Sequence, residues 1–265
     1  MTFIDDEQRA GYRHDGFVVI RDVLDAAARE RLAAAIDACR AAPSTNYRVL
    51  SPSGQASVDS DLFRAADAEA IDWLGRRSAL PRIAAALLDS PRAVVFVEDQ
   101  WFASAPGSTT PSPWHQDSPY YAIDVPFVTM WCPIDQVPAS VALRVVPGSH
   151  TWGREFAPVE FAADGSTIGS PRAGTAQLEP VPAVGDEAVV TDAGAGDVVA
   201  FDARLLHAAG GAVDAAFRRF SLRFAPATAR YVRPPWPVAS FWDELPHGLR
   251  DGDLLAGDVF PVVDL

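Results

Sequence analysis

The hydrophobic pattern of the chain changes near residue 93. Before this point, apolar residues recur at helical spacing; after it, they fall in short runs separated by turns such as Ala105-Pro106-Gly107. Many short strands with frequent turns are typical of a β-barrel or a double-sheet jelly roll. The pattern therefore predicts a mainly β protein with flanking α-helices at its N-terminal end.

The N-terminal part combines helices with one short strand. Helical spacing covers residues 4–42, interrupted by an apolar strand over 16–20, and it returns over about 62–89. Strand-like runs follow at Val94–Val97, Val125–Ile134, Ala142–Val146, Ala188–Thr191, Asp197–Phe201 and Arg218–Phe224. We expect one domain over residues 1–265, with a helical flank over about 1–92, a β core over about 93–229 and an irregular tail over 230–265.

Two segments predict long loops. Residues 43–61 are rich in Pro, Ser, Gly and Asp, and residues 157–186 form a Gly/Pro-rich insertion. Long loops at the mouth of a barrel often form walls of a binding site. We therefore expect both segments to act as lids.

The charge balance excludes several classes of chemistry. The net charge is −13 and all 22 basic residues are Arg, because the chain contains no Lys. This excludes a Schiff-base lysine and a phosphate-loop lysine, and it argues against a nucleic-acid-binding protein, which needs a basic face. No apolar run approaches the ~20 residues of a membrane span, and the acidic N-terminus lacks the order of a signal peptide. We expect a cytoplasmic protein with a small-molecule substrate; the sequence leaves the oligomeric state open.

The strongest local motif is Trp114-His115-Gln116-Asp117-Ser118. On a strand, residues i and i+2 point to the same face, so His115 and Asp117 would present an imidazole and a carboxylate side by side. A later strand end at His207 can bring a second imidazole. Two His and one carboxylate on one face of a metal form the facial triad of non-haem Fe(II) oxygenases. His-x-Asp alone is a common tripeptide without this role.

A second pattern concerns Arg218. Strand alternation places Arg218 on the apolar face that carries Phe220, Leu222 and Phe224, and this face should point inward. A buried guanidinium is costly unless it is paired. One partner is an anionic ligand such as the dicarboxylate 2-oxoglutarate. The other possible partner is a carboxylate elsewhere in the chain, in a structural salt bridge.

These motifs, in this order and spacing, resemble the phytanoyl-CoA dioxygenase (PhyH) family of Fe(II)/2-oxoglutarate-dependent oxygenases. The resemblance extends over nearly the whole chain. It is carried by these segments: Tyr12–Arg21, Pro106-Gly107, Pro113–Asp117, Val145–His150, Gly196–Phe201, and His207 with Arg218.

The resemblance implies a double-stranded β-helix (jelly-roll) core. It also implies His115, Asp117 and His207 as iron ligands, Arg218 as the 2-oxoglutarate anchor, and O₂ as the oxidant. The implied reaction decarboxylates 2-oxoglutarate to succinate and hydroxylates an unactivated C–H of a small or medium metabolite. Many relatives carry Lys shortly before the Pro-Gly turn as a second contact to 2-oxoglutarate, where this chain has Ser104.

Other side chains near these motifs are weaker candidates. Gln100 and Phe102 share a strand face and can line the co-substrate site, with ordinary sheet packing as the alternative. Thr129 is assigned to the same site, on the strand face it shares with Trp131. The aromatic residues near the metal motif can bracket a substrate or pack in the core, and Arg144 can bind an anionic substrate or form a salt bridge. The substrate candidates are Trp114, Tyr120, Tyr121, Trp131 and Arg144.

Three alternative functions remain open at this point. The same centre can perform desaturation, epimerisation or cyclisation, since the outcome depends on how the substrate lies. A non-catalytic jelly-roll binding module would keep a metal for structure alone. A hydrolase using a metal-bound water is the third, and it has no need for Arg218.

Overall fold

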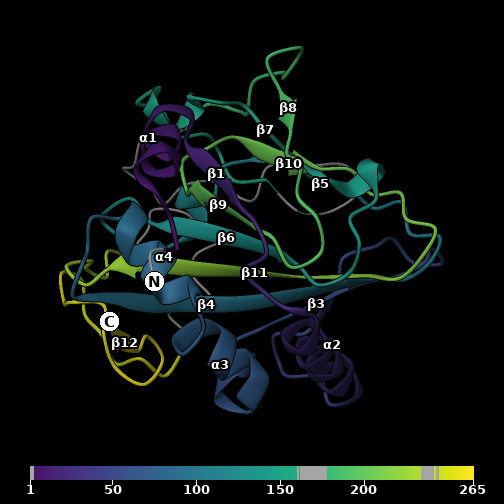
Figure 1. Ribbon diagram of the computed structural model, residues 1–265, viewed down its shortest axis with the longest axis horizontal. Coiled ribbons are helices and arrows are strands. Elements are labelled where there is room, and N and C mark those ends of the chain that lie inside the picture. Colours follow the sequence, from purple (N-terminus) through teal and green to yellow (C-terminus); the bar gives the residue numbers. More distant parts are fainter. Residues whose placement is uncertain (1–2, 160, 162–177, 234–241, 243–244) are drawn as a thin grey trace.

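The computed structural model describes residues 3–159, 161, 178–233, 242 and 245–265. Two antiparallel sheets lie face to face, and helices α2, α3 and α4 lie along the outer side of the larger sheet (Figure 1). This is the double-stranded β-helix architecture that the sequence predicts. Within the described residues, no helix is long and apolar enough to cross a membrane.

The larger sheet has eight strands in the order β1-β9-β6-β11-β4-β3-β2, with β12 paired to β4. Its strands are β1 (Phe17–Ile20), β2 (Arg48–Val49), β3 (Val58–Leu62), β4 (Ala93–Ser104), β6 (Val128–Pro133), β9 (Val198–Asp202), β11 (Phe217–Pro226) and β12 (Val262–Asp264). The smaller sheet has the order β5-β10-β7-β8. Its strands are β5 (Ser112–His115), β7 (Leu143–Val145), β8 (Val189–Val190) and β10 (His207–Ala209).

The described part of the chain forms the α-helices α1 (Asp6–Asp15), α2 (Ala26–Ala41), α3 (Glu69–Arg76) and α4 (Leu80–Leu87). Helix α1 begins with a capping box, in which the Asp5 carboxylate accepts the backbone N–H of Gln8 and the Gln8 side chain accepts that of Asp5. It ends at Gly16, whose φ of 84° suits glycine. An added Cβ at Gly16 would also lie 2.4 Å from His150 Nδ1, so the turn into β1 requires glycine. The expected order of helix, strand and helix over residues 4–42 is confirmed.

Three expectations about the elements need correction. The segment 43–61 is not a loop throughout, because it contains β2 and most of β3, which pairs with β4. The single helix expected over 62–89 is two helices joined through a turn. The tail from residue 230 is not wholly irregular, since Val262–Asp264 pairs with Ala93–Val95. The pairings of β3 and β12 with β4 join segments far apart in the chain, so the spacing of neighbouring residues does not predict them.

Strand β11 is buried on both faces. Phe220, Leu222 and Phe224 pack into the main hydrophobic core beneath the helices. The opposite face, which carries Arg219, Ser221 and Arg223, lines a cavity between the two sheets. The sequence therefore predicts the two faces correctly, but the expectation that the apolar one faces the functional site is wrong.

Candidate metal centre and cavity

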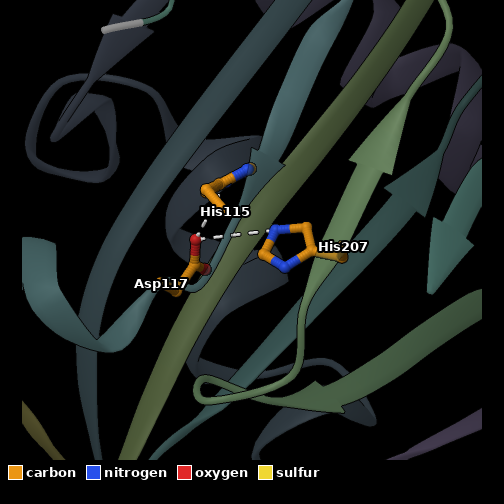
Figure 2. Close-up of side chains that lie close together, drawn as sticks. All are labelled: His115, Asp117 and His207. Carbon is orange, nitrogen blue, oxygen red and sulfur yellow. Dashed lines mark ion pairs between the residues drawn. The ribbon is translucent and has the colours of Figure 1, made fainter. Parts of the chain in front are cut away.

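Two imidazoles meet across a strand pair of the smaller sheet. His115 is the last residue of β5 and His207 the first of β10, and the two residues are direct partners in the antiparallel register. Their ring centroids lie 4.1 Å apart. Asp117 lies beyond the end of β5 with helical backbone angles, at the start of a short 3-10 turn over Ser118–Tyr120. The three side chains converge as Figure 2 shows, although the turn, and not strand alternation, directs Asp117 toward His115.

The three side chains offer matched donor atoms. His115 Nε2 and His207 Nε2 lie 3.5 Å and 3.7 Å from Asp117 Oδ1. All three ligand atoms lie within 4.8 Å of one another. Metal–ligand bonds of about 2.1 Å place facial ligands roughly 3 Å apart, so a small contraction would close the site on an ion.

Backbone carbonyls fix the tautomer of both imidazoles. His115 Nδ1 lies 2.8 Å from the Pro113 carbonyl oxygen, and His207 Nδ1 lies 3.0 Å from that of Leu205. A carbonyl only accepts, so each Nδ1–H donates and each Nε2 keeps its lone pair for a metal. Burial, reinforced by the neighbouring His115, lowers the pKa of His207 to about 3. The imidazole is therefore neutral at physiological pH, as a metal ligand must be.

The second oxygen of Asp117 is held by other residues. Thr129 Oγ1 donates a hydrogen bond to Asp117 Oδ2 at 2.6 Å, and Arg223 Nε and a terminal nitrogen each lie 3.3 Å from the same oxygen. Burial alone would raise the pKa of Asp117, but Arg223 and the imidazoles outweigh it and hold the pKa well below its usual range. Only Oδ1 is free toward the imidazoles, so the carboxylate is arranged to bind a metal through one oxygen.

Arg223 also joins this carboxylate to a second buried acid. It donates to Glu98 Oε1 at 3.0 Å and to Gln100 Oε1 at 3.0 Å, and the Tyr121 hydroxyl donates to the same Glu98 oxygen at 2.6 Å. Burial raises the pKa of Glu98 to about 7, although Arg223 pulls in the opposite direction. The network ties β4, β11 and the turn that carries Asp117 together beside the metal ligands.

The triad opens into a cavity of about 220 Å³. Its walls are mostly apolar and aromatic, with a few polar groups near the triad. The described lining residues that are neither triad members nor charged are Leu50, Val58, Leu62, Gln100, Phe102, Thr110, Pro111, Ser112, Tyr120, Tyr121, Trp131, Leu143, Phe161, Phe201, Ala209 and Ser221. Beside the triad, the charged lining residues are Glu98, Arg219 and Arg223.

Arg218 lies outside the cavity, which corrects its expected position. Its Nε and a terminal nitrogen each lie 2.9 Å from an oxygen of Asp135, and its other terminal nitrogen lies 3.2 Å from Asp37. The structural salt bridge, which the sequence left open as an alternative, is what the structure contains. Two carboxylates already compensate this guanidinium, so it has no need of an anionic ligand.

The neighbouring Arg219 is the arginine that reaches the cavity. Its guanidinium carbon lies 4.7 Å from the Phe102 ring centroid and 5.3 Å from that of Phe217. It donates to the Ser104 hydroxyl at 3.2 Å, and it forms no ion pair with a carboxylate of the described residues. Burial lowers the pKa of Arg219 to about 10, so the group remains a cation at neutral pH. A half-buried cation that faces a cavity and lacks a counter-charge among the described residues is poised to receive an anion.

The other sequence candidates divide into two groups. Gln100, Phe102, Tyr120, Tyr121 and Trp131 line the cavity as expected. Ser104 and Thr129 lie behind it, bonded to Arg219 and Asp117 respectively.

Two residues that the sequence predicts as substrate contacts, Arg144 and Trp114, lie elsewhere in the structure. Arg144 lies 5.3 Å from the ring centroid of Trp114, and neither side chain lines the cavity. The stack lies on the smaller sheet, where Trp114 packs with Val146, Phe156 and Leu206. The place of Trp114 in the metal motif, and of Arg144 before the Pro-Gly-Ser-His turn, therefore does not bring either side chain into the cavity.

The structure describes only part of the two segments that the sequence predicts as lids. Leu50 and Val58 from segment 43–61 line the cavity, as does Phe161 from segment 157–186. The remainder of the second segment includes residues 160 and 162–177, which lie outside the described residues.

Sequence reasoning missed Glu98, Arg219 and Arg223. A signal for them was present, because Glu98, Gln100 and Phe102 alternate along β4 and pair with Arg223, Ser221 and Arg219 along β11. Two facing polar stripes on neighbouring strands of a barrel indicate a polar interior.

Comparison with known proteins identifies the family. The family model for phytanoyl-CoA dioxygenase (PhyH) matches residues 12–220, which include the triad and all of the strands that bear it. The chain belongs to the phytanoyl-CoA dioxygenase family. A search of curated proteins finds no match.

Solved structures share the fold over nearly the full length. The epimerase SnoN, solved in complex with Fe3+, alpha ketoglutarate and nogalamycin RO, is 22% identical with a TM-score of 0.76, and 97% of each chain is covered. The carbocyclase SnoK from nogalamycin biosynthesis is 19% identical with a TM-score of 0.73, covering 98% of this chain and 96% of its own. EctD from S. alaskensis is 18% identical with a TM-score of 0.66, covering 88% and 81%.

Family membership and the complete triad together define the class of protein. The chain is a non-haem iron- and 2-oxoglutarate-dependent enzyme, and iron and 2-oxoglutarate are its cofactor and co-substrate. A non-catalytic binding module and a metal-dependent hydrolase are therefore both set aside. The type of oxidation is a separate question, because one centre of this kind supports several outcomes.

Proposed function

We propose that the protein hydroxylates an unactivated C–H bond of a small or medium metabolite, with decarboxylation of 2-oxoglutarate to succinate. His115, Asp117 and His207 hold Fe(II) on one face, and the whole chain acts as one catalytic domain. The observation that carries the proposal is the triad in a mostly apolar cavity whose lining also includes Arg219, a cation with no ion pair to a described carboxylate.

Arg219 is assigned to the distal carboxylate of 2-oxoglutarate. Its planar guanidinium, positioned against Phe102 and Phe217, can form a two-pronged pair with a carboxylate, and Ser104 orients it from behind. Bound iron supplies the activation of O₂ when the co-substrate is present. The protein's own contribution is to hold the distal carboxylate with Arg219, to position the substrate C–H and to exclude water with the aromatic walls.

Epimerisation or cyclisation at the same centre is the second candidate. It is favoured by the overall similarity to SnoN and SnoK, which are named as an epimerase and a carbocyclase. The two candidates differ in where the substrate lies relative to the metal.

The test is an anaerobic titration of the protein with Fe(II) and then with 2-oxoglutarate. A visible charge-transfer band that needs both additions supports the proposal. Admission of O₂ should then yield succinate, and Asp117→Ala should abolish both the band and the succinate. An unchanged band in Asp117→Ala, or no band in the unaltered protein, would refute the assignment.

A further inference from the structure

The charges around the cavity constrain what the substrate can be. With Fe(II) and 2-oxoglutarate bound, and Glu98 ionised above its pKa of about 7, the positive charges of the metal, Arg219 and Arg223 equal in number the negative charges of Asp117, Glu98 and the dicarboxylate. An imidazole that binds a metal through Nε2 and donates its Nδ1–H to a carbonyl carries no net charge. A charged substrate group would therefore enter an apolar cavity without a counter-charge among the described residues, and such burial is strongly unfavourable.

Neither Arg219 nor Arg223 is available to pair with a charged group of the substrate. Arg223 is already shared by Glu98, Asp117, Gln100 and the Ser221 carbonyl oxygen. Arg219 is the one assigned to 2-oxoglutarate. No third cation lies among the described residues that line the cavity, so a substrate phosphate or carboxylate would have no partner there.

The walls favour an apolar substrate body. Leu50, Val58 and Leu62 line the cavity together with Leu143, and the aromatic rings of Tyr120, Trp131, Phe161 and Phe201 add to the apolar surface. Phe161 lies 4.7 Å from His115, and Phe201 lies 4.5 Å from His207, both measured between ring centroids. Apolar surface therefore borders the metal ligands directly, and hydrophobic contact is the main attraction available there.

One polar group near the triad is left with unused bonding capacity. Glu98 lines the cavity, and both of its hydrogen bonds, from Tyr121 and Arg223, go to Oε1. No described residue donates to Oε2. A carboxylate oxygen only accepts, so it can bind a hydroxyl or N–H donor.

We infer that the substrate is an uncharged, predominantly apolar molecule that presents a hydroxyl or other hydrogen-bond donor to Glu98 beside the reacting carbon. Arg223 links Glu98 to Asp117, so a group bound to Glu98 lies one guanidinium away from a metal ligand. Glu98 is thus a specificity-determining residue. This inference rests on the proposed function, since it takes Arg219 to be occupied by 2-oxoglutarate.

The test uses four naphthalene probes that share one apolar body. Naphthalene has no polar group, 2-naphthol has a neutral donor, 2-naphthoate is an anion and 2-(aminomethyl)naphthalene is a cation. Binding is measured by anaerobic equilibrium dialysis against the protein loaded with Fe(II) and 2-oxoglutarate, at a pH above the pKa of about 7 of Glu98. We expect 2-naphthol to bind most tightly, and both charged probes to bind at least about tenfold more weakly.

Glu98→Gln should reduce the preference for 2-naphthol over naphthalene several-fold, because a charge-assisted hydrogen bond becomes a neutral one. The matched control is Asp99→Asn, which neutralises the adjacent buried carboxyl. Asp99 accepts the backbone N–H groups of Arg64 and Ala65 and does not line this cavity, so the preference should stay unchanged.

The inference is overturned if either charged probe binds as tightly as 2-naphthol, if no probe binds, or if Glu98→Gln leaves the preference intact. Binding of 2-oxoglutarate to the Fe(II) protein is measured first by the same equilibrium dialysis. If 2-oxoglutarate does not bind, the proposed function fails and the inference fails with it. If it binds and the probes rank differently, the inference alone fails.

Discussion

Replacing Arg219 by Leu should remove most of the affinity for 2-oxoglutarate. The guanidinium lies against the rings of Phe102 and Phe217, its one hydrogen bond among the described residues goes to Ser104, and no described carboxylate competes for it. Removing one partner of a buried, hydrogen-bonded charge pair costs about 2–5 kcal/mol. This corresponds to roughly 30-fold to several-thousand-fold weaker binding, at about 1.4 kcal/mol for each factor of ten.

The matched control is Arg218→Leu, one residue away on the other face of β11. Arg218 is partly exposed and pairs with Asp135 and Asp37, so its loss should cost about 1 kcal/mol of stability or less and leave 2-oxoglutarate affinity unchanged. Anaerobic calorimetric titration of 2-oxoglutarate into the Fe(II) protein measures the affinity, and thermal unfolding measures the stability.

A further expectation separates a binding role for Arg219 from a structural one. The metal-free Arg219→Leu protein should be no less stable than the unaltered protein, because the substitution removes a half-buried cation that has no counter-charge among the described residues. Fe(II) affinity should also be unchanged. Weaker 2-oxoglutarate binding in Arg218→Leu, with normal binding in Arg219→Leu, would refute the reasoning.

Three more predictions follow from the packing and the electrostatics. Thr129→Val removes the hydrogen bond to Asp117 at 2.6 Å and should weaken Co(II) binding about 10- to 100-fold in a spectroscopic titration, whereas equal affinity would show that Thr129 does not position the ligand. Glu98 has its pKa raised to about 7 in the folded protein, against an ordinary value of 4.5, so folding takes up a proton between these values. The free energy of unfolding of the metal-free protein should therefore fall as pH rises from 5 to 8, by up to about 3 kcal/mol from this group, and urea unfolding of Glu98→Gln should show a flatter slope. If the free energy of unfolding of Glu98→Gln depends on pH with the same slope as in the unaltered protein, the raised pKa of Glu98 is contradicted. Gly75→Ala would place a Cβ 2.2 Å from the Phe96 ring and should lower stability by about 1–3 kcal/mol in the same assay, while Gly11→Ala, also within a helix and with no neighbouring atom within 4 Å of the added Cβ, is the control. A fully stable Gly75→Ala would mean that Phe96 moves freely.

The sequence by itself determined the class of fold and the three metal-binding side chains. Periodicity separated a helical flank from a β core, and turn residues marked most strand boundaries, because both signals depend on neighbouring residues alone. His115 and Asp117 were recognisable because they are two residues apart in the chain. His207 became the third member because a strand end there matched the order of motifs in the family.

Tertiary structure decided which arginine serves the cavity. Alternation along Phe217–Phe224 divides the side chains into two faces, but it does not say which face lies inside when both are buried. Helices cover one face of β11 and the smaller sheet covers the other, so the polar face lines the cavity and the apolar face forms the core. The partners of Arg218 are 83 and 181 residues away in the chain. Electrostatic pairing over such separations exists only once the chain has folded, so only the structure shows that Arg218 is already paired with carboxylates and that Arg219 faces the cavity.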